Sequence, residues 1–395
     1  MPGVPLERLK AFLISMRFVF ILYSLLAIVT AVKQFISGPA SYNNYLIYKY
    51  TFWHSLQGQI LYGGYPEEYF DSNHYGPVFA LLMTPFAVLP DGIGMVLWNL
   101  ANALLLVAGI YGLPLSTAKK SVIAFICAHE ALGALLSFQF NVGLTGLMLL
   151  SFSYTIKQQE TKAAVAIATG TLIKLYGIVG LAFFFFSKNK IRLIISGVIA
   201  LAILFALPMV LHSAAFTVQS YADWYSSLVH KNAQNVSGNS MQDISLMGLV
   251  RRISGNHELP NTYFLLGGIL LFALPYLRVK QYQYTAFRLM LLASTLIFVV
   301  IFSSGSESPT YIIAFTGVAI WFMIQPQPKS AWVIGLFVLA LLLTSFSPSD
   351  LFPKFIRESY IKPYALKALP CVLVWLVIIY QMLRNDFKQY SLAAS

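Results

Sequence analysis

The chain has 395 residues, of which 58% are hydrophobic and only 10% are charged. Since a soluble domain carries about 25% charged residues, this composition excludes an ordinary soluble protein and is typical of a polytopic membrane protein. The net charge is +12. The basic residues lie in short clusters beside apolar segments, as the positive-inside rule describes for cytoplasmic loops. Because they form no basic face, they do not indicate a nucleic-acid partner.

Apolar segments recur along the whole chain, and we expect an all-α fold of about twelve transmembrane helices in one membrane domain over residues 1–395. The first, 18–36, is expected to be a retained helix, because no small-residue cleavage site follows it. Two segments are short for the ~20 residues that a straight crossing needs. The predicted spans are 17–36, 77–90, 92–114, 121–136, 140–157, 163–186, 191–212, 262–279, 286–304, 309–325, 331–347 and 366–384, of which 77–90 and 121–136 are the short ones.

The basic clusters orient these spans in a cell membrane with both termini in the cytoplasm. Three longer segments, 37–76, 213–261 and 347–365, then lie on the opposite face, where any polar chemistry has to take place. Lys119 with Lys120, and Lys157 with Lys162, fall on the outer side and do not fit this orientation.

The first outer loop opens with Tyr and Trp residues every three or four positions from Tyr42 to Trp53, a spacing that favours a helix lying in the membrane interface. Gly63, Gly64 and Pro66 are expected to end this helix.

The sequence YPEEYFDSNHYGP at 65–77 follows, with Glu67, Glu68 and Asp71 beside His74. The chain has only 14 acidic residues, so three of them directly before an apolar segment are unusual. They are either solvated acids or include a general base for a lipid-linked substrate.

Two ionisable residues lie well inside predicted spans. Glu130, preceded by His129, lies in 121–136, and Lys174 lies in 163–186. Because an intramembrane charge is costly, such residues are treated as functional by default. At similar depth, Glu130 and Lys174 either form a structural ion pair, or Lys174 binds a phosphate or acts in gating.

The second outer loop contains NSMQDISLMGLVRRIS at 239–254. The apolar residues between Ser240 and Arg252 predict a short interfacial helix. Arg251 and Arg252 are then expected at the outer membrane surface, where guanidinium groups suit either a specific phosphate or pyrophosphate headgroup or general contact with anionic lipid.

Cys127 and Cys371 both lie in apolar segments, so neither predicts a disulfide or a metal site. The chain also has no Walker loop, dinucleotide-binding glycine motif or HExxH motif. We therefore expect no metal and no cofactor.

Several segments in the order of the chain resemble glycosyltransferase family 87, once catalogued as domain of unknown function 2029, in the GT-C superfamily of multi-pass membrane enzymes. SFQFN is similar to that family's Gly-Gln-x-Asn segment, and LIKLYG is similar to its Lys-x-Tyr-Pro segment. NSMQDISLMGLVRR is similar to its Asn-x-Ser stretch ending in Arg. The segments are NNYLIYKYTFWHSLQGQILY at 43–62, HYGPVFALLMTPFAVLP at 74–90, LWNLANALLL at 97–106, SFQFN at 137–141, LIKLYG at 172–177 and NSMQDISLMGLVRR at 239–252.

The resemblance implies transfer of a sugar (a hexose such as mannose, or a pentose) from a polyprenyl-phosphate donor to a cell-envelope glycan or glycolipid on the outer face. In the family, a carboxylate of the first outer loop is the general base, but the corresponding position here is Asn44, which cannot accept a proton. Phe138 and Gly177 also replace a family Gly and Pro. The base has therefore moved to Asp71 or Glu68, or the chain is a non-catalytic relative.

From the residues and the resemblance together, we expect Asp71 to be the base and Glu68 the second candidate. The remaining expected site residues bind the donor phosphate (Lys174, Arg251, Arg252), hold sugar hydroxyls or other parts of the substrate (Asn44, His54, Asn239), or are polar groups within the membrane (Glu130, Gln139, Asn141). The alternatives are a transporter or flippase for a lipid-linked or anionic solute, and a non-catalytic subunit of an envelope assembly complex.

Overall fold

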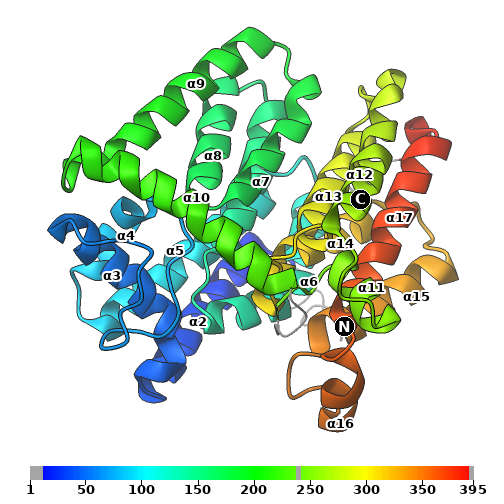
Figure 1. Cartoon of the computed structure of the whole chain (residues 1–395). Helices are drawn as coiled ribbons and strands as arrows, with labels where there is room; N and C mark the ends of the chain where they lie inside the picture. The colour runs from blue at the N-terminus through cyan, green and yellow to red at the C-terminus, as the bar shows by residue number, and fades with distance from the viewer. Residues whose placement is uncertain (1–11, 237–241, 391–395) are drawn as a thin grey trace, which may run out of the picture. The chain divides into compact units, whose positions relative to one another are not determined.

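The computed structural model describes residues 12–236 and 242–390, and every regular element in these ranges is a helix (Figure 1). This confirms the predicted all-α fold. Asn239 lies outside the described residues. The chain divides into two compact units: unit 2 comprises Arg17–Leu113 and Ala134–Lys231, and unit 1 comprises the described parts of Met1–Met16, Pro114–Gly133 and Asn232–Ser395. The prediction of a single membrane domain stays a prediction.

Unit 2 is built on a row of neighbouring helices, in which α5 packs on α7, α7 on α8 and α8 on α9, while α3 packs on α4 (Figure 1). Its elements are α2 (Met16–Ile36), η1 (Pro39–Tyr42), α3 (Asn43–Gln57), α4 (Phe79–Ala87), α5 (Asp91–Gly112), α7 (Asn141–Ile156), α8 (Glu160–Ile173), η2 (Leu175–Phe186), α9 (Lys190–Ala206), η3 (Leu207–Val210) and most of α10 (Ala214–Val236).

Glycines let α5 and α7 approach closely. A Cβ atom on Gly109 would lie 2.8 Å from the carbonyl oxygen of Gly146, and a Cβ on Gly146 would collide with the backbone of Leu105. Small residues at a helix contact are the usual way in which membrane helices pack tightly, because burial of apolar surface gives little driving force in lipid.

The predicted continuous span 163–186 is wrong, because the helix breaks at Lys174. This residue has extended backbone angles (φ −148°, ψ 122°) between α8 and the 3₁₀ helix η2. Gly177 then packs back against Gly170, with no room for a side chain. The lysine therefore lies at a backbone break, where its side chain can point into the unit instead of along a helix face.

Unit 1 is centred on α13, whose residues are almost all buried, and which packs against α14 and α17. The elements of unit 1 are most of α6 (Thr117–Leu136), α11 (Leu246–Ser254), α12 (Asn261–Ala273), η4 (Leu274–Leu277), η5 (Val279–Gln281), α13 (Thr285–Ile301), η6 (Ser308–Thr310), α14 (Tyr311–Ile324), α15 (Ala331–Leu339), η7 (Ala340–Phe346), α16 (Lys354–Ile356), η8 (Arg357–Ile361), η9 (Leu366–Ala368), α17 (Leu369–Arg384) and η10 (Phe387–Gln389).

Four helices of the described chain are long and apolar enough to cross a membrane, judged by length and composition: Met16–Ile36, Asp91–Gly112, Lys190–Val210 and Leu366–Arg384. Each matches a predicted span to within two residues. Six further apolar helices are shorter, at 10–17 residues, and α4 has only nine residues in place of the predicted 77–90. The predicted number of twelve spans is not confirmed.

Candidate functional site

Residues 37–76 contain α3, and this confirms the helix predicted there from the aromatic spacing. The helix ends earlier than predicted, at Gln57, where Gly58 has a left-handed conformation (φ 70°) that caps it. A Cβ on Gly58 would also lie 2.5 Å from the ring of His212, so both the backbone angle and the space require glycine. This early end places His54 in the last turn of α3.

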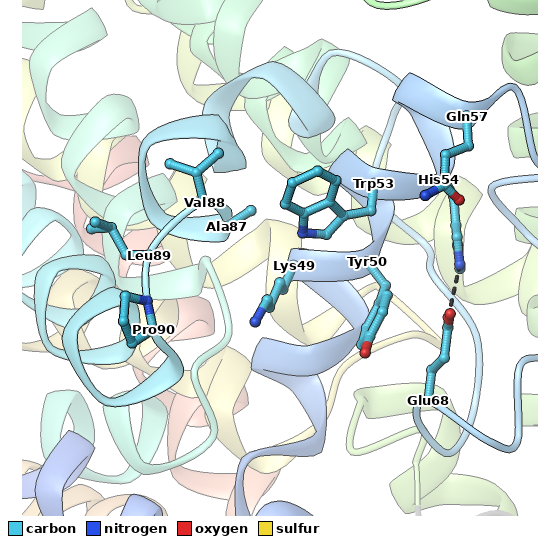
Figure 2. A pocket seen from close by; sticks show the side chains of 10 residues that line it. All are labelled: Lys49, Tyr50, Trp53, His54, Gln57, Glu68, Ala87, Val88, Leu89 and Pro90. Carbon is cyan, nitrogen blue, oxygen red and sulfur yellow. Dashed lines mark hydrogen bonds and ion pairs between the residues drawn. The ribbon is translucent and has the colours of Figure 1, made fainter.

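His54 and Glu68 point at each other from α3 and the following loop (Figure 2). His54 Nε2 lies 2.7 Å from Glu68 Oε2, and the imidazole packs on the Tyr65 ring, tilted by 33°, with ring centroids 3.9 Å apart. Burial lowers the pKa of His54, against the opposing effect of Glu68. The neutral ring therefore donates its Nε2 hydrogen to the carboxylate and holds Glu68 in one orientation.

A cavity of about 500 Å³ lies beside this pair (Figure 2). Trp53 and Tyr50 of α3 form aromatic walls, and Lys49, bound to Asp91 at 2.6 Å, supplies a cation. Aromatic and apolar walls with a few placed polar groups are typical of small-ligand sites. The side chain of Glu68 is 31% exposed, so its carboxylate can be reached from this cavity.

Asp71 and Asn44 do not line this cavity. Asp71 has a left-handed backbone (φ 71°), a side chain that is 56% exposed, and an Oδ2 atom 3.7 Å from Lys231 Nζ. Asn44 donates from Nδ2 to the carbonyl oxygen of Ser137 at 2.8 Å. Its neighbour Asn43, to which we assigned no role from sequence, exchanges two hydrogen bonds with the backbone of Phe70 and so fastens the acidic loop to α3.

A second group of polar side chains surrounds Lys174. Lys174 Nζ donates to Asn141 Oδ1 at 2.8 Å, and Asn141 Nδ2 donates to Gln139 Oε1 at 2.6 Å. The ammonium also lies 5.7 Å and 5.1 Å from the ring centroids of Tyr75 and Tyr176. The structure thus brings Lys174, at a backbone break, together with Asn141 at the start of α7 and Gln139 in the connection before it.

The segment His74–Pro77 packs directly on this break. The N–H of Gly76 donates to the carbonyl oxygen of Ile173 at 3.0 Å, and a Cβ on Gly76 would collide with the carbonyl oxygen of Leu172. Only glycine allows this approach, so three of the segments that carry the family resemblance (74–90, 137–141 and 172–177) meet at Lys174.

His74 is a site residue to which we assigned no role from sequence. Its Nδ1 atom lies 3.0 Å from Ser227 Oγ of α10, and its buried Nε2 atom has no hydrogen-bond partner in the structure. Burial, followed by the charge of Lys231, lowers the pKa of His74 to about 4; Asp71 opposes this shift and Lys174 adds to it. The imidazole is therefore neutral at pH 7, within the electrostatic reach of two lysines and one carboxylate.

The contacts from α10 could not be expected, because Ser227 and Lys231 lie in a segment that was predicted as a loop. We name the residues of this region, Asp71, His74, Gln139, Asn141, Lys174 and Lys231, the lysine site. All belong to unit 2.

The predicted role of Arg251 at the membrane surface is wrong. The residue is only 2% exposed and forms an ion pair with Asp243 at 2.6 Å. Its Nη1 atom donates to the carbonyl oxygen of Leu259 and to Asn261 Oδ1 at 2.8 and 2.9 Å. These bonds close the loop around α11, which begins at Leu246, capped by the side chain of Ser245, rather than at Ser240. Arg251 is therefore a structural residue of unit 1.

An ion pair with Lys174 was one of two alternatives for Glu130, and the structure instead pairs Glu130 with Lys367. Both carboxylate oxygens of Glu130 accept hydrogen bonds from Lys367 Nζ, at 3.0 and 3.1 Å, and both residues are 4% exposed. His129 contacts Ser345 Oγ through Nδ1 at 3.0 Å. Cys127 and Cys371 are buried and free.

The sequence profile of glycosyltransferase family 87 matches residues 73–304, which is more than half of the chain. Among solved structures, the crystal structure of ArnT from Cupriavidus metallidurans bound to undecaprenyl phosphate is similar, with a TM-score of 0.45 and 14% identity over 91% of this chain and 77% of that chain. This similarity is too distant to place site residues. A comparison with curated proteins finds no match.

Proposed function

The chain belongs to glycosyltransferase family 87, and from this membership we propose that it transfers a sugar from a polyprenyl-phosphate donor to a glycan or glycolipid acceptor. We propose the lysine site as the reaction centre. The observation that carries the proposal is the convergence of 74–77, 139–141 and 174 inside the matched region. We place the reaction on the non-cytoplasmic face of the cell membrane, with both termini in the cytoplasm, as the basic clusters favour.

In this proposal Lys174 binds the phosphate of the donor. The acceptor hydroxyl attacks the anomeric carbon, the bond between that carbon and the phosphate oxygen breaks, and its electron pair stays on the phosphate. The ammonium of Lys174 stabilises the growing negative charge on the leaving group. Asn141 and Gln139 orient the lysine, and both are amides that contribute no charge of their own.

We assign Asp71 as the base that accepts the proton of the acceptor hydroxyl, in place of the family Asp that is Asn44 here. Asp71 is exposed, and its charge acts on His74 beside Lys174. Its left-handed backbone is a conformation that a non-glycine residue rarely adopts and that is common at functional sites. Asn44 then only positions the chain, through Ser137.

Glu68 is the second candidate for the base, because it lines a cavity and its orientation is held by His54. If Glu68 is not the base, we assign the cavity beside His54 and Glu68 to binding of the sugar, with His54 contacting its hydroxyl groups. Trp53 and Tyr50 offer ring faces on which a sugar can pack.

The test compares Asp71→Asn with Glu68→Gln in purified protein, supplied with radiolabelled polyprenyl-phosphate hexoses and pentoses. Replacing the assigned base, Asp71, should lower the rate of polyprenyl-phosphate release by about 10²–10⁴-fold, since that is the usual contribution of general base catalysis. A large decrease of the release rate in Glu68→Gln but not in Asp71→Asn would show that Glu68 is the base. Absence of release by the unmodified protein with every donor would identify a non-catalytic relative, and movement of an intact donor across vesicles would identify a flippase.

A further inference from the structure

The cavity beside His54 and Glu68 lies in unit 2, and no residue of the lysine site is among those that line it. Its floor is one face of α3, where the lining residues recur at helical spacing, at positions 49, 50, 53, 54 and 57. Glu68 flanks this face on one side and residues 87–90 flank it on the other (Figure 2). Six of the ten lining residues precede residue 73, where the match to the family begins. The family profile therefore does not account for the polar side of this cavity.

Several polar groups that line the cavity are not used by the fold. In the described part of the chain, the indole N–H of Trp53, the hydroxyl of Tyr50 and the amide of Gln57 form no hydrogen bond with the protein. Glu68 contacts His54 through Oε2 alone, so Oε1 is open on a side chain that is 31% exposed. These groups are therefore free to bind a ligand.

The combination of rings and free polar groups suits a saccharide. A sugar ring has an apolar face of C–H groups, which packs on the negative face of an aromatic ring such as Trp53 or Tyr50. Its hydroxyls lie around the edge of the ring, where an amide and a carboxylate such as Gln57 and Glu68 can bind them. The volume of about 500 Å³ is within the usual range of about 300–1,000 Å³ for small-ligand sites.

The charges around the cavity disfavour an anionic ligand. The ammonium of Lys49 is balanced by Asp91, whose Oδ1 atom lies 2.6 Å away. His54 is neutral, and the carboxylate of Glu68 adds one negative charge. A second carboxylate or a phosphate on the ligand would be repelled by Glu68. The lining therefore favours a neutral sugar over a uronic acid or a sugar phosphate.

We propose that this cavity binds a neutral sugar ring of the acceptor, an inference that rests on the proposed sugar transfer. The base of this reaction takes its proton from the acceptor and not from the donor sugar. Both candidate bases adjoin the cavity: Glu68 lines it, and Asp71 follows three residues later, at most about 11 Å along the backbone. The donor sugar, by contrast, is bonded directly to the phosphate that we assign to Lys174. It therefore lies at the lysine site and leaves this cavity to the acceptor.

The experiment is saturation-transfer NMR of the purified protein without donor, in a detergent that has no sugar headgroup. The probes are the methyl glycosides of glucose, galactose, mannose and arabinose, with the methyl uronides of the three hexoses as anionic counterparts. We expect at least one neutral glycoside to bind, and its uronide to bind about tenfold more weakly because of Glu68. Glu68→Gln should remove this difference. Binding of no neutral glycoside, or tighter binding of the uronide, would overturn the inference.

Two variants of α3 locate the bound sugar. Trp53→Leu should weaken binding of the glycoside by about tenfold, because it removes the ring on which the sugar packs. Gln57→Ala should weaken it less. Gln57 is exposed, and alanine is favourable in a helix, so this variant keeps the test valid even if thermal unfolding shows that Trp53→Leu is not folded. Trp332→Leu, which removes a 52% exposed tryptophan of α15 in unit 1, is the matched control and should bind the glycoside like the unmodified chain.

The transfer assay, with the bound glycoside as acceptor, separates this inference from the proposed function. Trp53→Leu should raise the KM of the acceptor and leave that of the donor unchanged. Equal binding in Gln57→Ala, folded Trp53→Leu and Trp332→Leu, or a raised KM for the donor alone, would overturn the inference and leave the proposed function in place. Glycoside binding that depends on Trp53, in a chain that releases no polyprenyl phosphate, would support the saccharide site and overturn the sugar transfer.

Discussion

Lys367 and Lys174 both lie in apolar segments, and their partners differ in charge. Lys367 in unit 1 donates to both oxygens of the Glu130 carboxylate, whereas Lys174 in unit 2 donates to the amide oxygen of Asn141 and lies over two tyrosine rings. A carboxylate neutralises an ammonium, while an amide orients it and leaves its net charge in place. Lys367 is buried and paired with an acid, so we expect it to be structural; Lys174 is half-buried and held by an amide, so we expect it to suit an anionic substrate.

The largest effect on stability is expected for Lys367→Met. This variant leaves Glu130 buried without its partner, which costs about 3–5 kcal/mol in the free energy of unfolding. Thermal unfolding in detergent measures it. The double variant Glu130→Gln with Lys367→Met should recover part of the lost stability, because the uncompensated carboxylate charge is gone. An unchanged melting temperature in Lys367→Met would show that the Glu130–Lys367 pair is not structural.

Adjacent arginines extend the same comparison. Arg251→Gln should destabilise by about 3 kcal/mol, since Asp243 then lacks its buried partner. Arg252→Gln should cost less, about 1–2 kcal/mol, because Asp243 keeps Arg251 as its partner when the hydrogen bonds of Arg252 to two carbonyl oxygens are lost. Chemical or thermal unfolding of the two variants side by side checks the order, and equal losses would contradict the separate roles assigned to them.

An effect smaller than the loss of Arg251 concerns the pH dependence of stability through His74. Its pKa in the folded protein is about 4, below about 6.5 in the unfolded chain. Between these values the unfolded chain binds a proton that the folded protein does not, so the stability present above pH 6.5 is lost as the pH falls through 4. From pH 7 to 5 the contribution should fall by at most about 2 kcal/mol. His74→Gln should show a shallower decrease over this range; identical slopes would mean that His74 is accessible and protonates freely.

The helices that hydropathy predicts well are the long, uniformly apolar ones, such as Met16–Ile36 and Lys190–Val210. The break at Lys174 was missed because hydropathy does not report backbone angles. Residues of α10 were predicted as a loop because its composition is mixed, although the helix supplies Lys231 to the lysine site and Ser227 as a partner of His74.

The sequence also did not predict which charged residues, far apart in the chain, form ion pairs. Glu130 and Lys367 are 237 positions apart, and depth along a span could not select between two lysines. Arg251 and Arg252 have the same chemistry in sequence, yet successive residues of a helix point about 100° apart, so Arg251 is buried in unit 1 and Arg252 is only partly buried. The contact of Lys174 with Asn141 and Gln139 was not predicted, because neither hydropathy nor the family resemblance says which segments meet in space.

The central claim is that Lys174 serves the reaction and not the fold. Lys174→Met tests it in purified protein, with polyprenyl-phosphate release and thermal unfolding measured on the same sample, and with the exposed Lys188→Met as the control. We expect the release rate to fall by at least about 10²-fold, the usual loss when one group that stabilises transition-state charge is removed, while the melting temperature stays near that of Lys188→Met. A variant that unfolds at clearly lower temperature yet transfers sugar at the control rate per folded molecule would contradict the account.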